Sequence, residues 1–145
     1  MTNRSSESGF TLVEALVAIV ILVFGLIAVT NLMVVAASSN SVANQGTAAA
    51  TIAAQRLEQL KAIPFGDARL AAGGNVTADA AGFFSNPDDT VPGVGQVHTR
   101  WQIVSPQPGV LFIRVRSEGT GVLSGARSRA EFTTFRTCTN TFLGC

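Results

Sequence analysis

Residues 10–37 read FTLVEALVAIVILVFGLIAVTNLMVVAA, and the expected architecture of the chain follows from this stretch. Glu14 is its only charged residue, and no charged residue occurs from Ala15 to Gln55. A helix of about 20 apolar residues crosses the hydrocarbon core of a membrane, whereas an ordinary secretory signal has an apolar centre of about 7–15 residues. We therefore expect a membrane-spanning helix over residues 10–37. A cut within residues 34–38, which would release a soluble secreted protein, is an alternative.

The start of the apolar stretch has two features that a simple membrane anchor does not need. The polar residues 1–9, MTNRSSESG, end abruptly at Gly9, and Glu14 follows five residues later inside the apolar run. A carboxylate within a membrane helix costs about 2.5–3.5 kcal/mol on insertion scales, so such a residue is a functional hypothesis by default. Alternatively, Glu14 lies at the lipid headgroups, where the positive end of the helix dipole favours it.

The six residues from Gly9 to Glu14, GFTLVE, resemble the prepilin peptidase site of type IV prepilins and type II secretion pseudopilins. The resemblance implies cleavage between Gly9 and Phe10, loss of residues 1–9 as a leader peptide, and N-methylation of Phe10. It also implies that Glu14 acts in assembly. An amine and a carboxylate near hydrocarbon both gain by pairing. Glu14 could accept the amine of Phe10 in its own chain, one helical turn away, or that of a neighbouring subunit.

The helix is expected to continue well beyond the membrane. No proline occurs between residue 10 and Pro64, and alanine is abundant, so we predict one helix over about residues 11–62, roughly 75–80 Å long at 1.5 Å per residue. Gly25 and Gly46 are candidate sites for bending. Residues 38–63 form an amphipathic half. Its apolar stripe consists of Ala49, Ile52, Ala53, Leu57, Leu60 and Ile63.

The remainder, residues 64–145, predicts a long loop followed by a small antiparallel sheet of about three strands. The loop, residues 66–96, is rich in Gly, Ala, Asn, Asp and Pro. Apolar and polar residues then alternate in two strands, and a third strand is expected over about residues 128–137. The side chains expected to pack against the helix stripe are Trp101, Ile103, Leu111, Ile113 and Phe132, with Val97, Thr99 and Val115 on the same faces. The fold class is therefore α+β.

The two cysteines, Cys138 and Cys145, lie in the last eight residues and can close a small loop. A disulfide persists only in an oxidising compartment. Because a membrane segment precedes the cysteines, we expect the bridge; two free thiols are the alternative.

Nothing in the sequence indicates an enzyme. The formal net charge is +1, and we find no catalytic triad spacing, no metal-ligand cluster and no phosphate-binding glycine loop, so neither a cofactor nor a nucleic-acid partner is expected. The sole histidine, His98, is expected to be exposed on the polar face of a strand. Asn86, Asp88 and Asp89 could bind calcium, but a turn is the favoured interpretation. Six arginines fall on the sheet, where an adhesive or DNA-touching face is the alternative to solvated strand faces: Arg100, Arg114, Arg116, Arg127, Arg129 and Arg136.

The order of the predicted parts is also similar to that of pilins. Two parts of the chain look most like PilV-type minor pilins: residues 53–65, AAQRLEQLKAIPF, and the strand of Trp101 followed by residues 111–117, LFIRVRS. Ser117 and Gly119 depart from the family, which often has hydrophobic or aromatic residues in its last strands. The resemblance implies a structural minor pilin that helps to initiate, assemble or decorate a type IV pilus. Alternatives are a minor pseudopilin of a type II secretion system, and a single-pass inner-membrane protein with a small periplasmic binding domain.

The resemblance implies partners and a location as well. The expected partners are the prepilin peptidase and methyltransferase, other pilins through their N-terminal helices, and the inner-membrane assembly platform with its ATPase. Before assembly the chain is expected to span the inner membrane once, with residues 64–145 in the periplasm. After assembly it is expected in a pilus at the cell surface or in a periplasmic pseudopilus.

Overall fold

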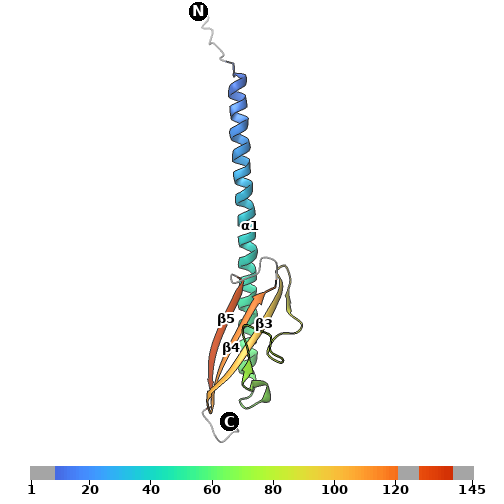
Figure 1. The fold of residues 1–145 in the computed structure, drawn as a ribbon, viewed down its shortest axis with the longest axis vertical. Coiled ribbons are helices and arrows are strands. Elements are labelled where there is room, and N and C mark those ends of the chain that lie inside the picture. Colours follow the sequence, from blue (N-terminus) through green and yellow to red (C-terminus); the bar gives the residue numbers. More distant parts are fainter. Residues whose placement is uncertain (1–8, 121–127, 139–145) are drawn as a thin grey trace, which may run out of the picture. The chain divides into compact units, whose positions relative to one another are not determined.

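The computed structural model describes residues 9–120 and 128–138. The chain divides into two compact units, Met1–Ser38 and Ser39–Cys145, and each is described by itself. The long helix α1 (Leu12–Ala62) contributes to both. The other elements belong to the second unit: the 3-10 helix η1 (Ala68–Leu70) and the strands β1 (Gly73–Gly74), β2 (Asp89–Val91), β3 (Gly95–Gln107), β4 (Val110–Gly119) and β5 (Arg129–Thr137) (Figure 1).

Helix α1 confirms the predicted helix to within one residue at its start. It is unbroken through Gly25 and Gly46, so neither glycine interrupts the helical hydrogen bonding. It ends at Ala62, two residues before Pro64, because the residue before a proline is disfavoured in the helical region and proline cannot donate a backbone hydrogen bond.

The sheet of the second unit has the strand order β1-β3-β4-β5, and β2 also pairs with β3. All pairings are antiparallel. The three predicted strands are confirmed as β3, β4 and β5. The two short strands come from the long connection, which lines the outer edge of β3: Gly73 pairs with Ile103, and Asp89 pairs with Val97. Strands β3 and β4 meet at a turn containing Pro108.

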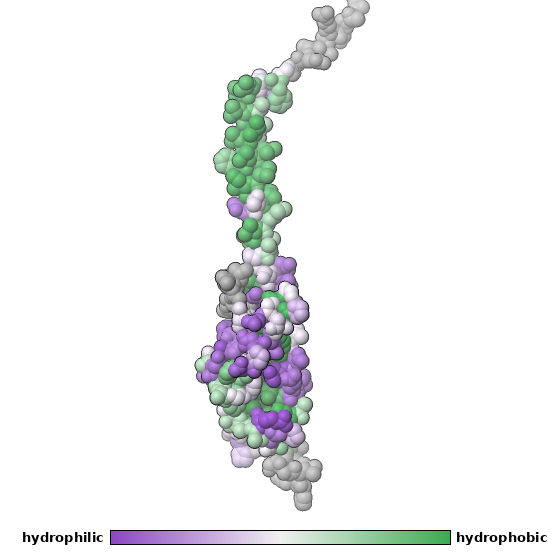
Figure 2. Space-filling model, turned by 90° about the vertical axis from the view of Figure 1, so that its right-hand side faces the viewer, coloured by the Kyte–Doolittle hydropathy of each residue, from purple (hydrophilic) through white to green (hydrophobic). Residues whose placement is uncertain are grey.

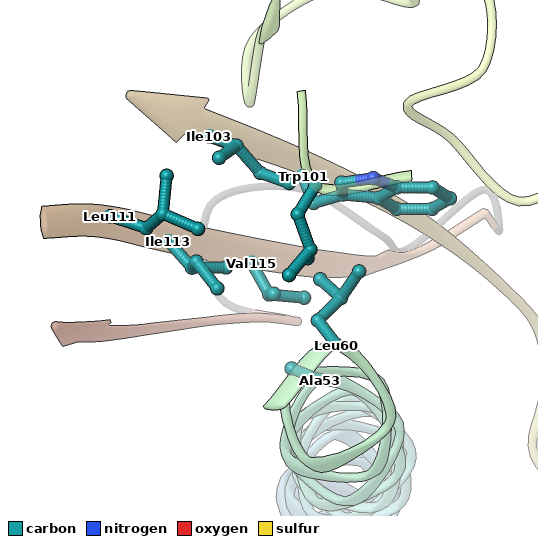
Figure 3. Packing of buried hydrophobic residues seen from close by; sticks show 8 residues of the cluster. Ala53, Leu60, Trp101, Ile103, Leu111, Ile113 and Val115 are labelled. Carbon is teal, nitrogen blue, oxygen red and sulfur yellow. The ribbon is translucent and has the colours of Figure 1, made fainter. Parts of the chain in front are cut away.

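The C-terminal part of α1 lies along one face of this sheet (Figure 1). Ala53 and Leu60 of the helix face the apolar side chains of β3 and β4, as the close-up in Figure 3 shows. Leu57 and Ile63 complete the contact from the helix. Burying a large apolar side chain contributes about 1.5–3 kcal/mol, so the sheet depends on its helix for stability. The strand residues in this cluster are Trp101, Ile103, Leu111, Ile113 and Val115.

The prediction that Phe132 is buried in this core is wrong. Phe132 lies opposite Val115 in the register, so it is on the face that packs against the helix. Its side chain nevertheless remains 39% exposed, whereas Val115 is fully buried. The reason is its place on β5, the end strand of the sheet, which supplies no buried hydrophobic residue to the core.

Hydroxyl groups fill the core next to the apolar cluster. The side chains of Thr99 and Ser117 are fully buried and hydrogen bond to each other across β3 and β4, with 2.8 Å between their oxygens. Ser85 from the connection joins them, because its hydroxyl accepts a hydrogen bond from the backbone N–H of Thr99 at 3.0 Å. Buried polar groups are tolerated when they are paired in this way. Ser117 is therefore a core residue in this chain.

Small residues also let the helix approach the sheet closely. Ala48 and Ala49 pack on Val97 in a second buried cluster. A Cβ atom added to Gly119 would lie 3.4 Å from the Oε1 atom of Gln45 on α1. Residues larger than alanine at these positions would push the helix outward, since protein interiors are close-packed. One long helix packed on an antiparallel sheet fits the α+β pilin-like fold that the sequence predicts.

Candidate functional site

The candidate site is the start of α1, where the predicted cleavage position lies. Gly9 and Phe10 are both exposed and precede the first helical residue, Leu12. A Cβ atom added to Gly9 would meet no heavy atom within 4 Å. Packing against the described residues therefore does not explain a glycine at this position.

Thr11 and Glu14 form the cap of the helix. The hydroxyl of Thr11 accepts a hydrogen bond from the backbone N–H of Glu14 at 3.3 Å, and the carbonyl of Thr11 accepts one from Ala15 at 3.2 Å. These bonds satisfy backbone donors that the first turn of a helix otherwise leaves unpaired. The sequence carries this signal as the capping pattern Thr-x-x-Glu, which was not among the sequence predictions.

The carboxylate of Glu14 is exposed and available. Across residues 9–120 and 128–138 it takes part in no hydrogen bond or ion pair. Its place in the first helical turn puts it near the positive end of the helix dipole, which favours a negative charge by about 0.3–1 kcal/mol. The structure thus holds Glu14 in a helical first turn and leaves its charge free to meet a partner from outside the described chain.

The helix surface that follows is largely apolar, with Thr30 and Asn31 as polar residues among the hydrophobic ones. Large hydrophobic side chains from Leu12 to Val35 are exposed, and Phe10 before them is 76% exposed. Figure 2 shows this part of α1 as a largely hydrophobic surface on the face in view. By length and composition α1 is sufficient to cross a membrane. Contiguous exposed apolar surface of this kind marks a membrane-contacting or protein-contacting region.

The predicted disulfide lies partly outside the described residues. Cys138 directly follows β5, and its backbone N–H donates a 2.8 Å hydrogen bond to the carbonyl of Gly109 in the β3–β4 turn. Cys145 is not among the described residues. The bridge between them therefore stays a prediction.

The prediction that His98 is exposed is wrong. It lies on the polar face of β3, but its side chain is only 12% exposed because Asp79 and Asp88 of the connection cover it. Its Nε2 is 2.8 Å from an oxygen of Asp79, and its Nδ1 is 2.5 Å from an oxygen of Asp88. Burial lowers the pKa of His98, but these hydrogen bonds outweigh burial and raise the pKa above its ordinary 6.5. No sequence pattern marked this cluster.

Several of the sheet arginines are ion-paired. Arg100 binds Asp79 at 2.6 Å and also contacts Glu118, and Arg116 lies 3.3 Å from Glu118. The hydrogen bonds from His98 and Arg100 lower the pKa of Asp79. Arg114 pairs with Glu131, whereas Arg127 is not among the described residues. These guanidinium groups are matched by carboxylates of the same unit.

Asp88 and Asp89, which were considered as calcium ligands, have separate places in the structure. Asp88 points to His98, and Asp89 begins β2. Among residues 9–120 and 128–138, no group of three or more His, Cys, Asp or Glu side chains is arranged to hold a metal ion.

Residues 4–30 match the family model described as the prokaryotic N-terminal methylation motif. No curated protein and no solved structure matches the chain. The matched range contains Gly9, Phe10 and Glu14 together with most of the exposed apolar surface. The motif indicates a pilin or pseudopilin, and it implies processing by a prepilin peptidase and assembly with other pilins. Together with the apolar helix it fits anchoring in a membrane before assembly.

Proposed function

We propose that this chain is a structural minor pilin, without enzymatic activity, that helps to initiate, assemble or decorate a type IV pilus. In this proposal the chain is cut between Gly9 and Phe10, Phe10 is methylated, and the apolar part of α1 first anchors the subunit in the inner membrane. The same helix surface then packs among the helices of other subunits, and the sheet domain faces outward.

The observation that carries the proposal is the combination found at residues 9–14 within the matched methylation motif. Packing against the described residues does not require a glycine at position 9, whereas recognition by the cutting enzyme would account for it. Glu14 is a carboxylate without a partner among the described residues, located at the start of an apolar helix. Both features make sense together if the chain is cut and its new amine is used in assembly.

The distribution of apolar surface supports an assembly role. In the second unit, residues 48–63 of α1 cover the apolar face of the sheet, so this face is buried within the same chain. In the first unit the large apolar side chains remain exposed. Lipid covers such a surface before assembly, and the helices of other subunits cover it afterwards. A carboxylate moved into this apolar setting needs a cation to offset its desolvation, and the amine of Phe10 in a neighbouring subunit supplies one.

The assembly role of Glu14 is tested by Glu14→Gln, which keeps the shape of the side chain and removes its charge. We expect normal cleavage and membrane insertion but at least a tenfold lower amount of the variant in sheared filaments, since about 1.4 kcal/mol is a factor of ten and a broken buried pair costs more. The measurement is quantitative immunoblotting of filament and membrane fractions.

Glu58→Gln is the matched control, because Glu58 is an exposed helix residue whose partner is Lys61 one turn away. Its incorporation should equal that of the unmodified chain. If Glu14→Gln were incorporated as well as Glu58→Gln, Glu14 would have no part in assembly.

The alternatives differ in the effect of deleting the chain and in whether residues 1–9 are removed. A minor pseudopilin carries the same type of N-terminal segment, but its deletion would abolish protein secretion and leave surface pili intact. A single-pass membrane protein would keep residues 1–9. Deleting the chain and measuring both pilus yield and protein secretion separates a minor pilin from a minor pseudopilin. The proposal requires a change in the yield or the subunit composition of pili, and loss of secretion alone would contradict it.

A further inference from the structure

The polar face of the sheet holds a cluster of charged side chains that the assembly role does not use. His98 and Arg100 lie on β3, and Glu118, directly opposite His98 in the register, lies on β4. Asp79 and Asp88 reach the same place from the connection before β3. These side chains line a surface hollow of about 430 Å³.

The contacts of His98 indicate the protonation state of its ring. Both ring nitrogens face carboxylate oxygens, Nδ1 that of Asp88 at 2.5 Å and Nε2 that of Asp79 at 2.8 Å. A neutral imidazole has a single N–H donor, and an ionised carboxylate has none. With both aspartates ionised, the two hydrogen bonds exist together only when His98 is protonated.

The charges around His98 favour that protonated state. With His98 protonated, three cations (His98, Arg100 and Arg116) face three carboxylates (Asp79, Asp88 and Glu118). Without the proton, His98 attracts neither aspartate by charge, and two cations remain for the three carboxylates of these ion pairs. Arg129, opposite Glu118 in the register, and the Arg114–Glu131 pair lie on the same face of the sheet. Arg100 is the cation that opposes protonation of His98, but Asp79 and Glu118 hold it in ion pairs of its own.

The two aspartates lie at opposite ends of a segment that the cluster ties down. Residues 79–88 run along the edge of β3, where Phe84 forms a bridge with Arg100 and its ring is 5.8 Å from that of His98. Within the segment, the backbone N–H of Ser85 donates to the carbonyl of Thr99 at 2.8 Å. Asp88 is the more buried of the two aspartates, with 25% of its side chain exposed against 49% for Asp79.

We propose that His98 is a proton-operated latch that holds residues 79–88 against β3. In the protonated state His98 binds both Asp79 and Asp88 and closes the segment on the sheet. When His98 loses its proton, one of the two hydrogen bonds is lost, His98 no longer attracts the two aspartates by charge, and the segment opens. The surface that the domain presents beside β3 therefore differs between mildly acidic and mildly alkaline solution.

The direction of the pH effect follows from the two shifts. The pKa of His98 is raised in the folded chain, so its contribution is complete below the unfolded value of 6.5 and is lost as pH rises through the folded value. The pKa of Asp79 is lowered, so its contribution is present above the unfolded value of 3.8 and is lost as pH falls through the folded value. The latch is thus tightest between pH 3.8 and 6.5.

The latch is tested on the full chain in detergent micelles. His98 is the only histidine, so its ring protons titrate without overlap in an NMR experiment. We expect an apparent pKa above 6.5. We also expect amide hydrogen exchange at Ser85, corrected for intrinsic rates, to be at least about tenfold faster at pH 8 than at pH 5, because a charge-assisted hydrogen bond that holds the segment is lost. An apparent pKa of 6.5 or below, or equal corrected exchange at the two pH values, would overturn the proposal.

Two variants and a matched control complete the test. Asp88→Asn should lower the pKa of His98, because it removes a hydrogen-bonded carboxylate. His98→Gln cannot titrate, so its corrected exchange at Ser85 should no longer depend on pH between 5 and 8. The neighbouring Asp89→Asn is the control and should leave the titration of His98 unchanged. If Asp88→Asn and Asp89→Asn shifted the pKa equally, Asp88 would not be the latch partner.

Discussion

Arg136 connects β5 to the end of α1 through a single side chain. Its Nη1 donates hydrogen bonds to the carbonyls of Leu60 at 3.2 Å and Ile63 at 2.9 Å. The last carbonyls of a helix have no partner within the helix, and a cation there also interacts favourably with the helix dipole. The guanidinium also lies 5.8 Å from the centre of the Phe65 ring. Arg136 therefore acts as a C-terminal cap supplied by a distant strand.

We predict that Arg136→Met destabilises the domain by about 1.5–3 kcal/mol, the usual range for hydrogen bonds that involve a charged group. The free energy of unfolding is measured by urea titration with the fluorescence of Trp101, the only tryptophan. Arg129→Met is the control, because Arg129 is an exposed residue of the same strand. Equal stability of the two variants would rule out the capping role.

At the scale of single residues, the sequence predicted the roles of those residues whose interaction partners lie close to them along the chain. GFTLVE is contiguous, so the residues of the processing motif could be recognised together. Arg136 was expected to be a solvated sheet residue, because its partners are backbone carbonyls more than 70 positions away, and these leave no mark on side-chain composition. The His98 cluster was missed for the same reason, since its aspartates come from a loop without periodicity.

Among the elements, β1 depends most strictly on glycine. Gly74 has a φ angle of +83°, and an added Cβ would lie 2.2 Å from the carbonyl oxygen of Trp101. Gly82 has nearly the same φ angle, +81°, but an added Cβ would meet nothing within 4 Å. The two glycines therefore separate the effect of backbone conformation from that of close packing.

We predict that Gly82→Ala costs about 1–2 kcal/mol, the penalty for a left-handed residue with a Cβ. Gly74→Ala should cost about 1–3 kcal/mol more, because the crowded methyl group also forces the connection away from β3. Urea unfolding followed by Trp101 fluorescence gives both values. If the two variants lost the same free energy of unfolding, the connection at Gly74 would move away from β3 without a measurable cost.

Elements with a long periodic pattern were predictable and short ones were not. The apolar stripe of α1 and the alternation in β3 and β4 follow from 3.6-residue and two-residue periods, and the structure confirms their buried faces. Strands β1 and β2 have two and three residues, which is too few to show a period. Phe132 was misplaced because alternation assigns a face but does not tell how far the helix covers an end strand.

At the scale of the whole molecule, one chain carries two kinds of surface. The domain formed by the second unit buries its apolar residues with its own helix residues. The first unit leaves a helix of exposed apolar residues behind a capped start at Thr11 and a free carboxylate at Glu14. The proposed cleavage before Phe10 would place an amine at that start, and assembly would then cover the apolar surface.

The intact mass of the chain purified from its native host tests this account most directly. We predict that the chain begins at methylated Phe10. Gly9→Val should keep residues 1–9, whereas Gly25→Val, the same change at another glycine with open space around it, should be processed normally. A native chain that still carries residues 1–9, or equal processing of both variants, would contradict the account.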